Sequence, residues 1–320
     1  MTMRRVLVTG AGGFIGGAVL AALQEAGRGR VVIRSLTRAP AVDGAQEHHT
    51  GDLSRPETLR GATDGADVLV HLASRVSGTE AECTAVNLFG TRELLNQARR
   101  SGVRRIVHLS TAAVYGAGPH RGISVDQVVP APVSPASRTR LAAEAEALAA
   151  GATVLRPGLV LGPGDRWVVP ALAELTRRVP ARWDDGNARL SLVEVHDLAR
   201  LIAALALGAP PCPAGVYHAS QPEPVRIQDL LDALASHGVL APAPDRSWSW
   251  HRCLDELRRT PGEISERQFH LLAQDHWYRS DEIWTDAGVR PGPGVPARLA
   301  GAASWYRRHL AAAGSTTPES

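Results

Sequence analysis

Three glycines near the start of the chain have the spacing of a phosphate-binding turn. Gly10, Gly13 and Gly16 follow an apolar run at residues 6–8 and precede an Ala/Leu-rich helical pattern over residues 17–23. The first glycine of such a turn permits a tight bend, the second lets the backbone approach a phosphate, and the third lets the helix pack close to the strand. Because the helix then offers free N–H groups and the positive end of its dipole, the stretch predicts a dinucleotide-binding site.

Two arginines after the next apolar run bear on the choice of dinucleotide. The run at residues 31–33 is followed by Arg34 and Arg38, with no acidic residue between them. A carboxylate at this place would bind the ribose 2′-OH of NAD and repel the 2′-phosphate of NADP. A guanidinium instead makes charge-assisted hydrogen bonds to a phosphate. The two arginines therefore predict NADPH as the cofactor, the alternative being that both are solvated surface residues.

Strand and helix patterns alternate through the first half of the chain. Apolar runs predict strands at residues 6–8, 31–33, 68–72, 106–109 and 153–155, and helical patterns span residues 17–23, 91–101 and 141–150. Strands that alternate with helices imply crossover units. We therefore predict an α/β fold with a Rossmann-type, doubly wound parallel sheet, whose ligands lie outside the carboxyl ends of the strands.

The character of the sequence changes after Gly164. All seven tryptophans lie beyond it, together with clustered prolines and without clean alternation. We expect residues 1–165 to form the dinucleotide-binding domain, with residues 190–220 returning to it. Residues 166–310 are predicted to form mainly a smaller C-terminal substrate-binding cap, and most of the tryptophans could equally fill its core. Residues 311–320 are predicted to be a disordered tail.

Charge and cysteine content exclude several classes of protein. The 320 residues carry a formal net charge of +3 and contain no lysine, and the arginine doublets are scattered, so we expect no nucleic-acid partner. No apolar run approaches the roughly 20 residues of a membrane span, and we expect no signal peptide and no membrane association. Three separated cysteines match a reducing cytoplasm and predict neither a disulfide nor a metal site.

Further motifs occur in order along nearly the whole chain. After the glycine turn they read GDL at residues 51–53, HLAS at 71–74, N-x-x-GT at 87–91, HLSTAAVYG at 108–116, LRPG…GPG at 155–164, VHDLA at 195–199, TDAG at 285–288 and WY at 305–306. Each motif alone is weak, but in this order they resemble the extended short-chain dehydrogenase/reductase superfamily, which contains the nucleotide-sugar epimerases and dehydratases. The resemblance implies a Rossmann fold and an NAD(P)-dependent oxidoreductase.

The resemblance also implies which residues hold the cofactor. The GDL aspartate would hold the adenine, the HLAS residues would lie beside the cofactor ribose, and the LRPG stretch would lie near the nicotinamide. With the glycine turn and the two arginines, the predicted cofactor-binding residues are Gly10, Gly13, Phe14, Ile15, Gly16, Arg34, Arg38, Asp52, Leu53, Leu72, Ala73, Ser74, Asn87, Arg140, Pro157 and Leu159.

The chain carries only part of the catalytic set that the resemblance implies. The family's catalytic Ser/Thr lies four residues before the VYG tyrosine, and Thr111 lies four residues before Tyr115. The family's Tyr-x-x-x-Lys pair should begin the next long helix, where the two positions are Ala136 and Arg140. Alanine transfers no proton, and the pKa of arginine is too high for a useful acid, although Arg140 could hold the ribose and supply positive charge. Tyr115 is then the best alternative proton donor in the chain, the other reading being that it is a packing residue.

A general acid or base raises the rate of such a reaction by about 10²–10⁴-fold. Its loss therefore slows a reductase but does not prevent the reduction. We predict a non-standard NADPH-dependent ketoreductase in which Thr111 holds the carbonyl and the proton comes from water or from a hydroxyl of the substrate. The second source favours an aromatic, polyketide-like ketone, and the pattern resembles the atypical angucyclinone-type ketoreductases of actinomycete antibiotic biosynthesis. We expect a cytoplasmic protein that is a monomer or a homodimer.

Two other functions remain open. A catalytically inactive NADP-binding sensor would explain the missing pair, but it would not explain why Thr111 is present. A nucleotide-sugar epimerase or dehydratase would need the missing base, because its reaction starts by oxidising a sugar hydroxyl.

Several other histidines are weaker candidates. His196 and Asp197 could form a base with its orienting acid, although the matching family segment is structural. His48 and His49 are expected on a loop without a third metal ligand. His120 is expected, with its neighbour Arg121, on a loop that could face the substrate, and residues 276–278 could line a pocket or a core.

Overall fold

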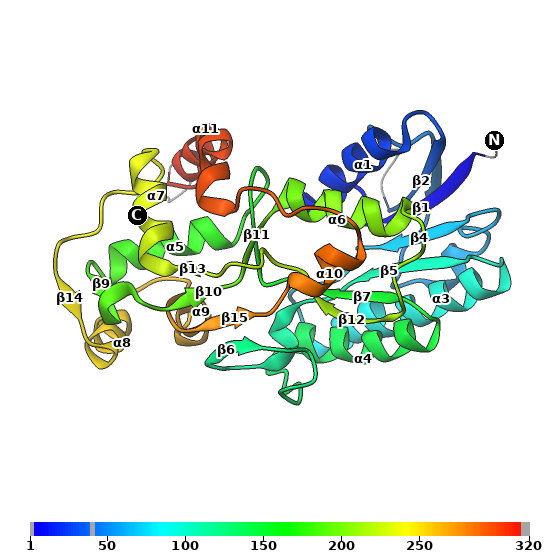
Figure 1. Ribbon diagram of the computed structural model, residues 1–320. Helices are drawn as coiled ribbons and strands as arrows, with labels where there is room; N and C mark the ends of the chain where they lie inside the picture. The colour runs from blue at the N-terminus through cyan, green and yellow to red at the C-terminus, as the bar shows by residue number, and fades with distance from the viewer. Residues whose placement is uncertain (1–2, 39–41, 315–320) are drawn as a thin grey trace.

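A seven-stranded parallel sheet organises the first half of the chain (Figure 1). The computed structural model describes residues 3–38 and 42–314. The strand order is β12-β7-β5-β4-β1-β2-β3, and every neighbouring pair is parallel. The strands are β1 (Arg4–Thr9), β2 (Val31–Thr37), β3 (Glu47–Thr50), β4 (Val68–His71), β5 (Arg105–Leu109), β7 (Thr153–Arg156) and β12 (Gly215–His218). The predicted α/β fold with a Rossmann-type sheet is confirmed.

Helices cover both faces of this sheet (Figure 1). One face carries α1 (Phe14–Gly27) and α6 (Val195–Leu207), and the other carries η2 (Thr84–Gly90), α3 (Thr91–Arg100) and α4 (Pro135–Ala149). In β1 the side chains alternate between the faces, because Val6 and Val8 pack in the core beside α1 and α6 whereas Leu7 packs in the core beside α3. Both faces are therefore buried, which explains why the strand is an unbroken apolar run.

Helix α4 begins six residues before the predicted pattern at residues 141–150. Ser134 caps it, since its hydroxyl accepts a hydrogen bond from the backbone N–H of Ser137, and Pro135 occupies the first helical position. The capped start places Ala136 and Arg140 in the first two turns of α4, at the end of the helix that faces the carboxyl end of β5.

The second lobe gathers most of the remaining chain around its own core (Figure 1). The buried Trp183 and Trp248 belong to that core. Its sheet has the order β13-β10-β15-β6, and β11 pairs with β8 and β14 with β9. The strands are β6 (His120–Ile123), β8 (Leu159–Leu161), β9 (Arg182–Trp183), β10 (Arg189–Leu190), β11 (Leu192–Glu194), β13 (Val225–Arg226), β14 (Ser247–Trp248) and β15 (His276–Tyr278).

The longer helices of this half are α5 (Val168–Arg178), α7 (Ile227–Ser236), α8 (Trp250–Arg259), α9 (Glu266–Ala273) and α11 (Val295–Gly314). The short ones in the chain are η1 (Pro56–Leu59), α2 (Glu80–Cys83), η3 (Ala112–Tyr115), η4 (Asp184–Gly186) and α10 (Asp281–Asp286). Of these, η3 and α2 matter for the site, because they border the carboxyl ends of β5 and β4.

The structure corrects three expectations about local elements. His48 and His49 lie in β3, and His120 lies in β6, so none of them is on a loop. These short strands have no apolar pattern, because all four side chains of β3 and two of the four residues of β6 are polar. Helix α11 continues to Gly314, so no disordered tail begins at residue 311, and residues 315–320 lie outside the described residues.

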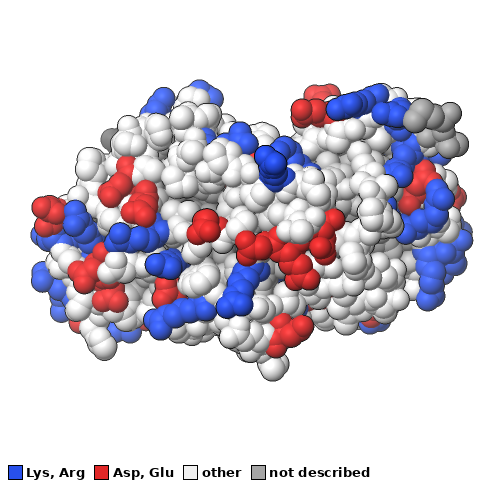
Figure 2. Space-filling model, in the orientation of Figure 1, with Lys and Arg blue, Asp and Glu red and all other residues white. Residues whose placement is uncertain are grey.

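The surface carries both signs of charge. On the face shown in Figure 2, arginine side chains lie in separate groups, and acidic side chains gather over α10. Within residues 3–38 and 42–314, no helix is both long enough and apolar enough to span a bilayer.

Candidate active site

The glycine turn connects β1 to α1 at the carboxyl edge of the sheet. Gly10 has a φ of +71°, and a Cβ atom there would lie 2.8 Å from the backbone nitrogen of Ala73. A Cβ atom on Gly16 would lie 2.0 Å from the carbonyl oxygen of Gly10. Side chains are therefore excluded at both positions. Gly13 is extended, exposed, and precedes the first residue of α1, so the free N–H groups of the helix open toward solvent. This geometry fits a dinucleotide pyrophosphate.

A buried polar link fixes this turn to the end of β4. The hydroxyl of Thr9 accepts hydrogen bonds from the backbone N–H groups of Leu72 and Ala73, and it lies 2.7 Å from Nδ1 of His71. The other ring nitrogen of His71 lies 2.9 Å from the hydroxyl of Thr91 on α3. Thr9 and His71 thus hold the predicted residues Leu72 and Ala73 against the glycine turn. Their role was missed because it depends on contacts between two strands that are neighbours in the sheet but 62 residues apart in the sequence.

The structure separates the two arginines that predicted NADPH. Arg34 lies beside Leu7 in the register of β1 and β2, within the strand and not at its carboxyl end. Its guanidinium contacts Glu47 of β3 at 2.8 Å and donates to two backbone carbonyls. The expectation that Arg34 binds the 2′-phosphate is therefore wrong, since its donors are already used inside the protein.

Arg38 follows the end of β2 and is exposed. Its charge acts on the carboxylate of Asp52, where burial raises the pKa but hydrogen bonds from Ser54 and the charges of Arg38 and Arg55 outweigh it and lower the pKa. Leu53 is buried under η2, because Gly90 packs against its backbone. Arg38 and Asp52 therefore share the adenine end of the predicted site.

Asn87 has a structural task in η2. Its amide nitrogen donates to the carbonyl oxygen of Arg75 and to the hydroxyl of Thr139, and its amide oxygen accepts from the N–H of Arg75. Both amide hydrogens are therefore committed, and the prediction that Asn87 binds the cofactor directly is corrected. Asn87 instead ties the loop that carries Ser74 to helix α4.

Thr111 and Arg140 meet at the carboxyl end of β5. Thr111 caps η3, and its hydroxyl oxygen accepts a hydrogen bond from the N–H of Ala113 at 3.2 Å, which leaves its O–H proton to be donated. The guanidinium of Arg140 donates to the carbonyl oxygens of Leu109 and Ser110 at 3.2 and 2.7 Å. Burial lowers the pKa of Arg140 to about 10, so it stays charged at neutral pH.

A buried donor of Arg140 has no partner within the described chain. Its Nε–H is buried and makes no hydrogen bond there. A buried guanidinium N–H without an acceptor is costly, and hydroxyl groups of a ribose are suitable acceptors. Arg140 therefore fits the predicted task of holding the cofactor ribose. Ala136 is buried and offers no polar atom, so the described site has no counterpart of the family tyrosine at this position.

A buried ionic network contacts Ser110, the residue before Thr111. Glu144, one helical turn after Arg140, accepts a hydrogen bond from the hydroxyl of Ser110. It also accepts hydrogen bonds from the guanidinium of Arg156, at 2.5 to 3.2 Å. The side chains of Arg156 and Glu144 are only 6% and 3% exposed. Through Arg140 and Glu144, α4 thus holds both the backbone and the side chain of Ser110, the residue next to Thr111.

The predicted alternative proton donor, Tyr115, belongs to this network and not to the substrate site. It is 2% exposed and stacks on Tyr278. Its hydroxyl accepts from Arg156 at 2.8 Å and lies 2.8 Å from Nε2 of His218 and 3.1 Å from the carbonyl oxygen of Val125. Burial raises the pKa of Tyr115. A phenol so enclosed cannot protonate a substrate, so Tyr115 is the packing residue of the two readings and not the proton donor.

The stretch after β7 completes the carboxyl edge. Pro157 is buried, and its carbonyl accepts from the N–H of Ala112, while Leu159 opens β8. Asp165, which sequence reasoning missed, accepts hydrogen bonds from three backbone N–H groups at the start of α5. Tyr306 of α11 donates its hydroxyl to Asp165 and accepts from the N–H of Gly162. A polar residue directly after GPG, followed by a helical pattern, is the cap signal that could have found it.

The structure does not pair His196 with Asp197: Nδ1 of His196 lies 2.7 Å from a carboxylate oxygen of Glu194. The carboxylate of Asp197 is buried and accepts from Arg200 and Arg298, so it joins α6 to α11. His48 bonds to Ser35 and Thr50, and His120 packs against Tyr115. Among the described residues, no three His, Cys, Asp or Glu side chains cluster as metal ligands.

We expect acid to destabilise the fold through its buried histidines. Burial lowers the pKa of His71 and of His218 to about 4. The unfolded chain, with histidine pKa values near 6.5, takes up protons that the native state does not bind, so stability is lost as the pH falls from about 6.5 to about 4. The loss should reach about 3 kcal/mol for each of the two residues. Urea unfolding at a series of pH values measures it.

The control for this prediction is an exposed histidine. A His218→Phe variant should show a shallower dependence of unfolding free energy on pH than the parent, whereas His251→Phe, at an exposed position, should keep the full slope. Equal slopes for all three proteins would contradict the assignment.

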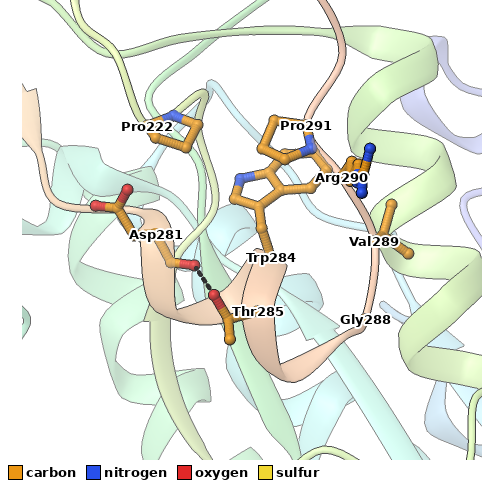
Figure 3. A pocket seen from close by; sticks show the side chains of 8 residues that line it. All are labelled: Pro222, Asp281, Trp284, Thr285, Gly288, Val289, Arg290 and Pro291. Carbon is orange, nitrogen blue, oxygen red and sulfur yellow. Dashed lines mark hydrogen bonds between the residues drawn. The ribbon is translucent and has the colours of Figure 1, made fainter.

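Two cavities lie outside the group formed by the glycine turn, Thr111 and Arg140. One, of about 340 Å³, is shown in Figure 3, where the Trp284 ring lies between Pro222 and Pro291 beside α10. Another, of about 670 Å³, follows the edge strand β12 between α10 and the end of α4. Neither is lined by a predicted site residue. The candidate site is therefore defined by the glycine turn, Thr111 and Arg140.

Comparison with known proteins gives a family and a fold. The model of the NAD dependent epimerase/dehydratase family matches residues 6–210. A 2-alkyl-3-oxoalkanoate reductase of Stenotrophomonas maltophilia is 31% identical over 316 residues, covering 90% of this chain and 94% of that protein. A 4-hydroxy-2-methyl-3-oxo-4-farnesyl-3,4-dihydroquinoline-1-oxide ketoreductase of Stigmatella aurantiaca is 34% identical over 244 residues, covering 72% of each chain.

Among solved structures, a short-chain dehydrogenase/reductase superfamily protein from Agrobacterium tumefaciens with bound NAD aligns with a TM-score of 0.74. The alignment covers 98% of this chain and all of that one, at 23% identity. At that identity the likeness supports the fold.

Proposed function

Because this chain belongs to the NAD dependent epimerase/dehydratase family, we propose that it is a non-standard ketoreductase that uses NADPH. Two relatives carry names of ketone reductases, which supports an oxidoreductase that acts on a ketone. The observation that carries the proposal is the hydrogen bonding of the Thr111 hydroxyl. Its hydroxyl oxygen already accepts from Ala113, so the group faces a ligand as a hydrogen-bond donor. A ketone oxygen is an acceptor and matches it.

The chain's own residues then act as follows. When bound, the nicotinamide cofactor supplies a hydride to the carbonyl carbon. Thr111 donates to the carbonyl oxygen and stabilises the negative charge that develops there. Arg140 holds the cofactor ribose and places a fixed positive charge beside the oxyanion. Neither Ala136 nor Arg140 delivers the final proton, so we assign it to water or to a hydroxyl of the substrate.

The same lack of a base favours reduction over the sugar chemistry of the family. An epimerase or dehydratase must remove a proton from a hydroxyl at the start, and Thr111 and Arg140 are both unsuited to that step. A substrate with a phenol beside the ketone supplies its own acid. We therefore propose an aromatic, polyketide-like ketone of the angucyclinone type and a role in the tailoring of an antibiotic.

A spectrophotometric assay tests the proposal. Purified protein should oxidise NADPH in the presence of 2′-hydroxyacetophenone, and faster than with acetophenone, which lacks the acidic neighbour. Equal rates would contradict substrate-assisted protonation. NADPH binding without turnover of any ketone would favour the inactive sensor.

The preference for NADPH rests on Arg38, and Arg38→Ala tests it. The substitution should raise the Kd for NADPH about 10-fold to 100-fold, because a charge-assisted hydrogen bond to the 2′-phosphate is lost. The Kd for NADH should change little. Protein fluorescence during titration with each cofactor measures both constants, and Arg60→Ala, another exposed arginine, should alter neither. Equal losses for the two cofactors would overturn the preference.

A further inference from the structure

Two loops with exposed apolar side chains meet at the first turn of α4. The first, residues 72–79, leaves the carboxyl end of β4, and the second, residues 124–134, precedes α4. In the described chain seven large apolar side chains are exposed, and these loops hold three of them. The exposed fractions are 72% for Val76, 84% for Val129 and 48% for Val133.

Side-chain contacts hold the two loops together beside the candidate site. Arg138 of α4 donates to the carbonyl oxygen of Val133 and pairs with Glu80 of α2 at 2.6 Å. Asn87 joins Arg75, the neighbour of Val76, to Thr139 of α4. The loops that carry Val76 and Val133 are therefore both tied to the first two turns of α4, which carry Ala136.

The second loop also reaches the turn that begins at Thr111. A Cβ atom on Gly116, the residue that ends η3, would lie 2.3 Å from the carbonyl oxygen of Ala131. The loop that carries Val129 and Val133 is thus packed on η3. The backbone of the second loop therefore lies against the end of the turn that begins at Thr111.

Both cations of this region are paired with carboxylates. The two loops and the first turn of α4 contain two cations, Arg75 and Arg138. Arg75 pairs with Glu82 at 2.9 Å and Arg138 with Glu80 at 2.6 Å. A diphosphate needs unpaired cations or a cluster of N–H donors, and these paired guanidiniums do not supply the charge.

We propose that the substrate carries a neutral, apolar chain or ring that leaves the carbonyl site between Val76 and Val133, and that it bears no phosphate. The proposal rests on the ketoreductase function and names its substrate class. Large apolar side chains stay exposed at the edge of a site where they meet an apolar ligand, because each buried CH₂ group contributes favourably to binding.

Ligand binding to the complex of the protein with NADP⁺ tests this without any turnover. The probes are 2′-hydroxyacetophenone, its analogue with a ten-carbon acyl chain, and UDP-glucose, each followed by calorimetry. The long ketone should bind at least about tenfold more tightly than the short one, and UDP-glucose should bind more weakly than either. Equal binding of the two ketones, or tighter binding of UDP-glucose, would overturn the proposal.

Three variants locate the contact. Val76→Asp and Val133→Asp should each remove most of the advantage of the long ketone and leave binding of the short one and of NADPH unchanged. Leu148→Asp, at an exposed apolar position near the far end of α4, should change nothing. Variants that weaken both ketones equally would contradict the assignment. If the ketones bind in the expected pattern but never oxidise NADPH, the ketoreductase function fails while the apolar binding surface stands.

Discussion

Replacing Thr111 by valine should lower kcat/KM for ketone reduction by about 10²–10³-fold, the usual effect of removing one donor to a developing oxyanion. Valine has nearly the same shape as threonine but no hydroxyl, so the carbonyl oxygen would lose its one side-chain donor. The Kd for NADPH should stay unchanged, because Thr111 faces the substrate. Steady-state kinetics and cofactor titration on the same preparation measure the two effects.

Thr111→Ser is the matched control. It keeps the hydroxyl that accepts from Ala113 and caps η3, so it should retain most of the activity. A valine variant as active as the parent would show that the carbonyl is held elsewhere. A valine variant that also loses NADPH binding would indicate damage to η3 and not the loss of a catalytic donor.

Removing the charge of Glu144 should cost about 3–5 kcal/mol of unfolding free energy, because it leaves the buried guanidinium of Arg156 without its counter-ion. The Glu144→Gln side chain has the same size, so the effect would come from charge. The double variant Glu144→Leu with Arg156→Met should be much more stable than the sum of its single variants implies. Urea unfolding of the parent, of Glu144→Leu, of Arg156→Met and of the double variant gives the four free energies that this double-mutant cycle needs.

An exposed ion pair provides the comparison. Arg258 and Glu266 are about half exposed and lie 2.8 Å apart, and Glu266→Gln should cost less than about 1 kcal/mol. Similar losses at the two sites would mean that the contact between Glu144 and Arg156 is not the source of stability.

Local patterns predicted the parts of the fold that local physics determines. The glycine turn, five of the seven strands of the main sheet and the helices α1, α3 and α4 each follow from spacing within about ten residues. β3 was missed because Glu47, His48 and His49 are polar, and β12 because it lies in the half without clean alternation. Both strands belong to the sheet through pairing with β2 and β7.

In the candidate site, too, local patterns did not predict the roles of residues whose partners are distant in the sequence. Arg34 has the right residue type and lies in the right strand, but its partner Glu47 lies in the strand that the pattern did not reveal. Tyr115 was considered as an acid because its partners Arg156 and His218 are 41 and 103 residues away. In contrast, the absence of the Tyr-x-x-x-Lys pair could be read directly, since no lysine occurs in the sequence.

The contact of Tyr306 with the GPG loop has a consequence for how the protein matures. A chain emerging from the ribosome exposes the glycine turn, all seven strands of the main sheet and Thr111 before it exposes α11. The N–H of Gly162 and the carboxylate of Asp165 obtain their shared partner only when Tyr306 docks. The GPG loop, which the family resemblance places near the nicotinamide, thus reaches its final structure only after a helix more than 140 residues further along the chain has been synthesised and has docked on it.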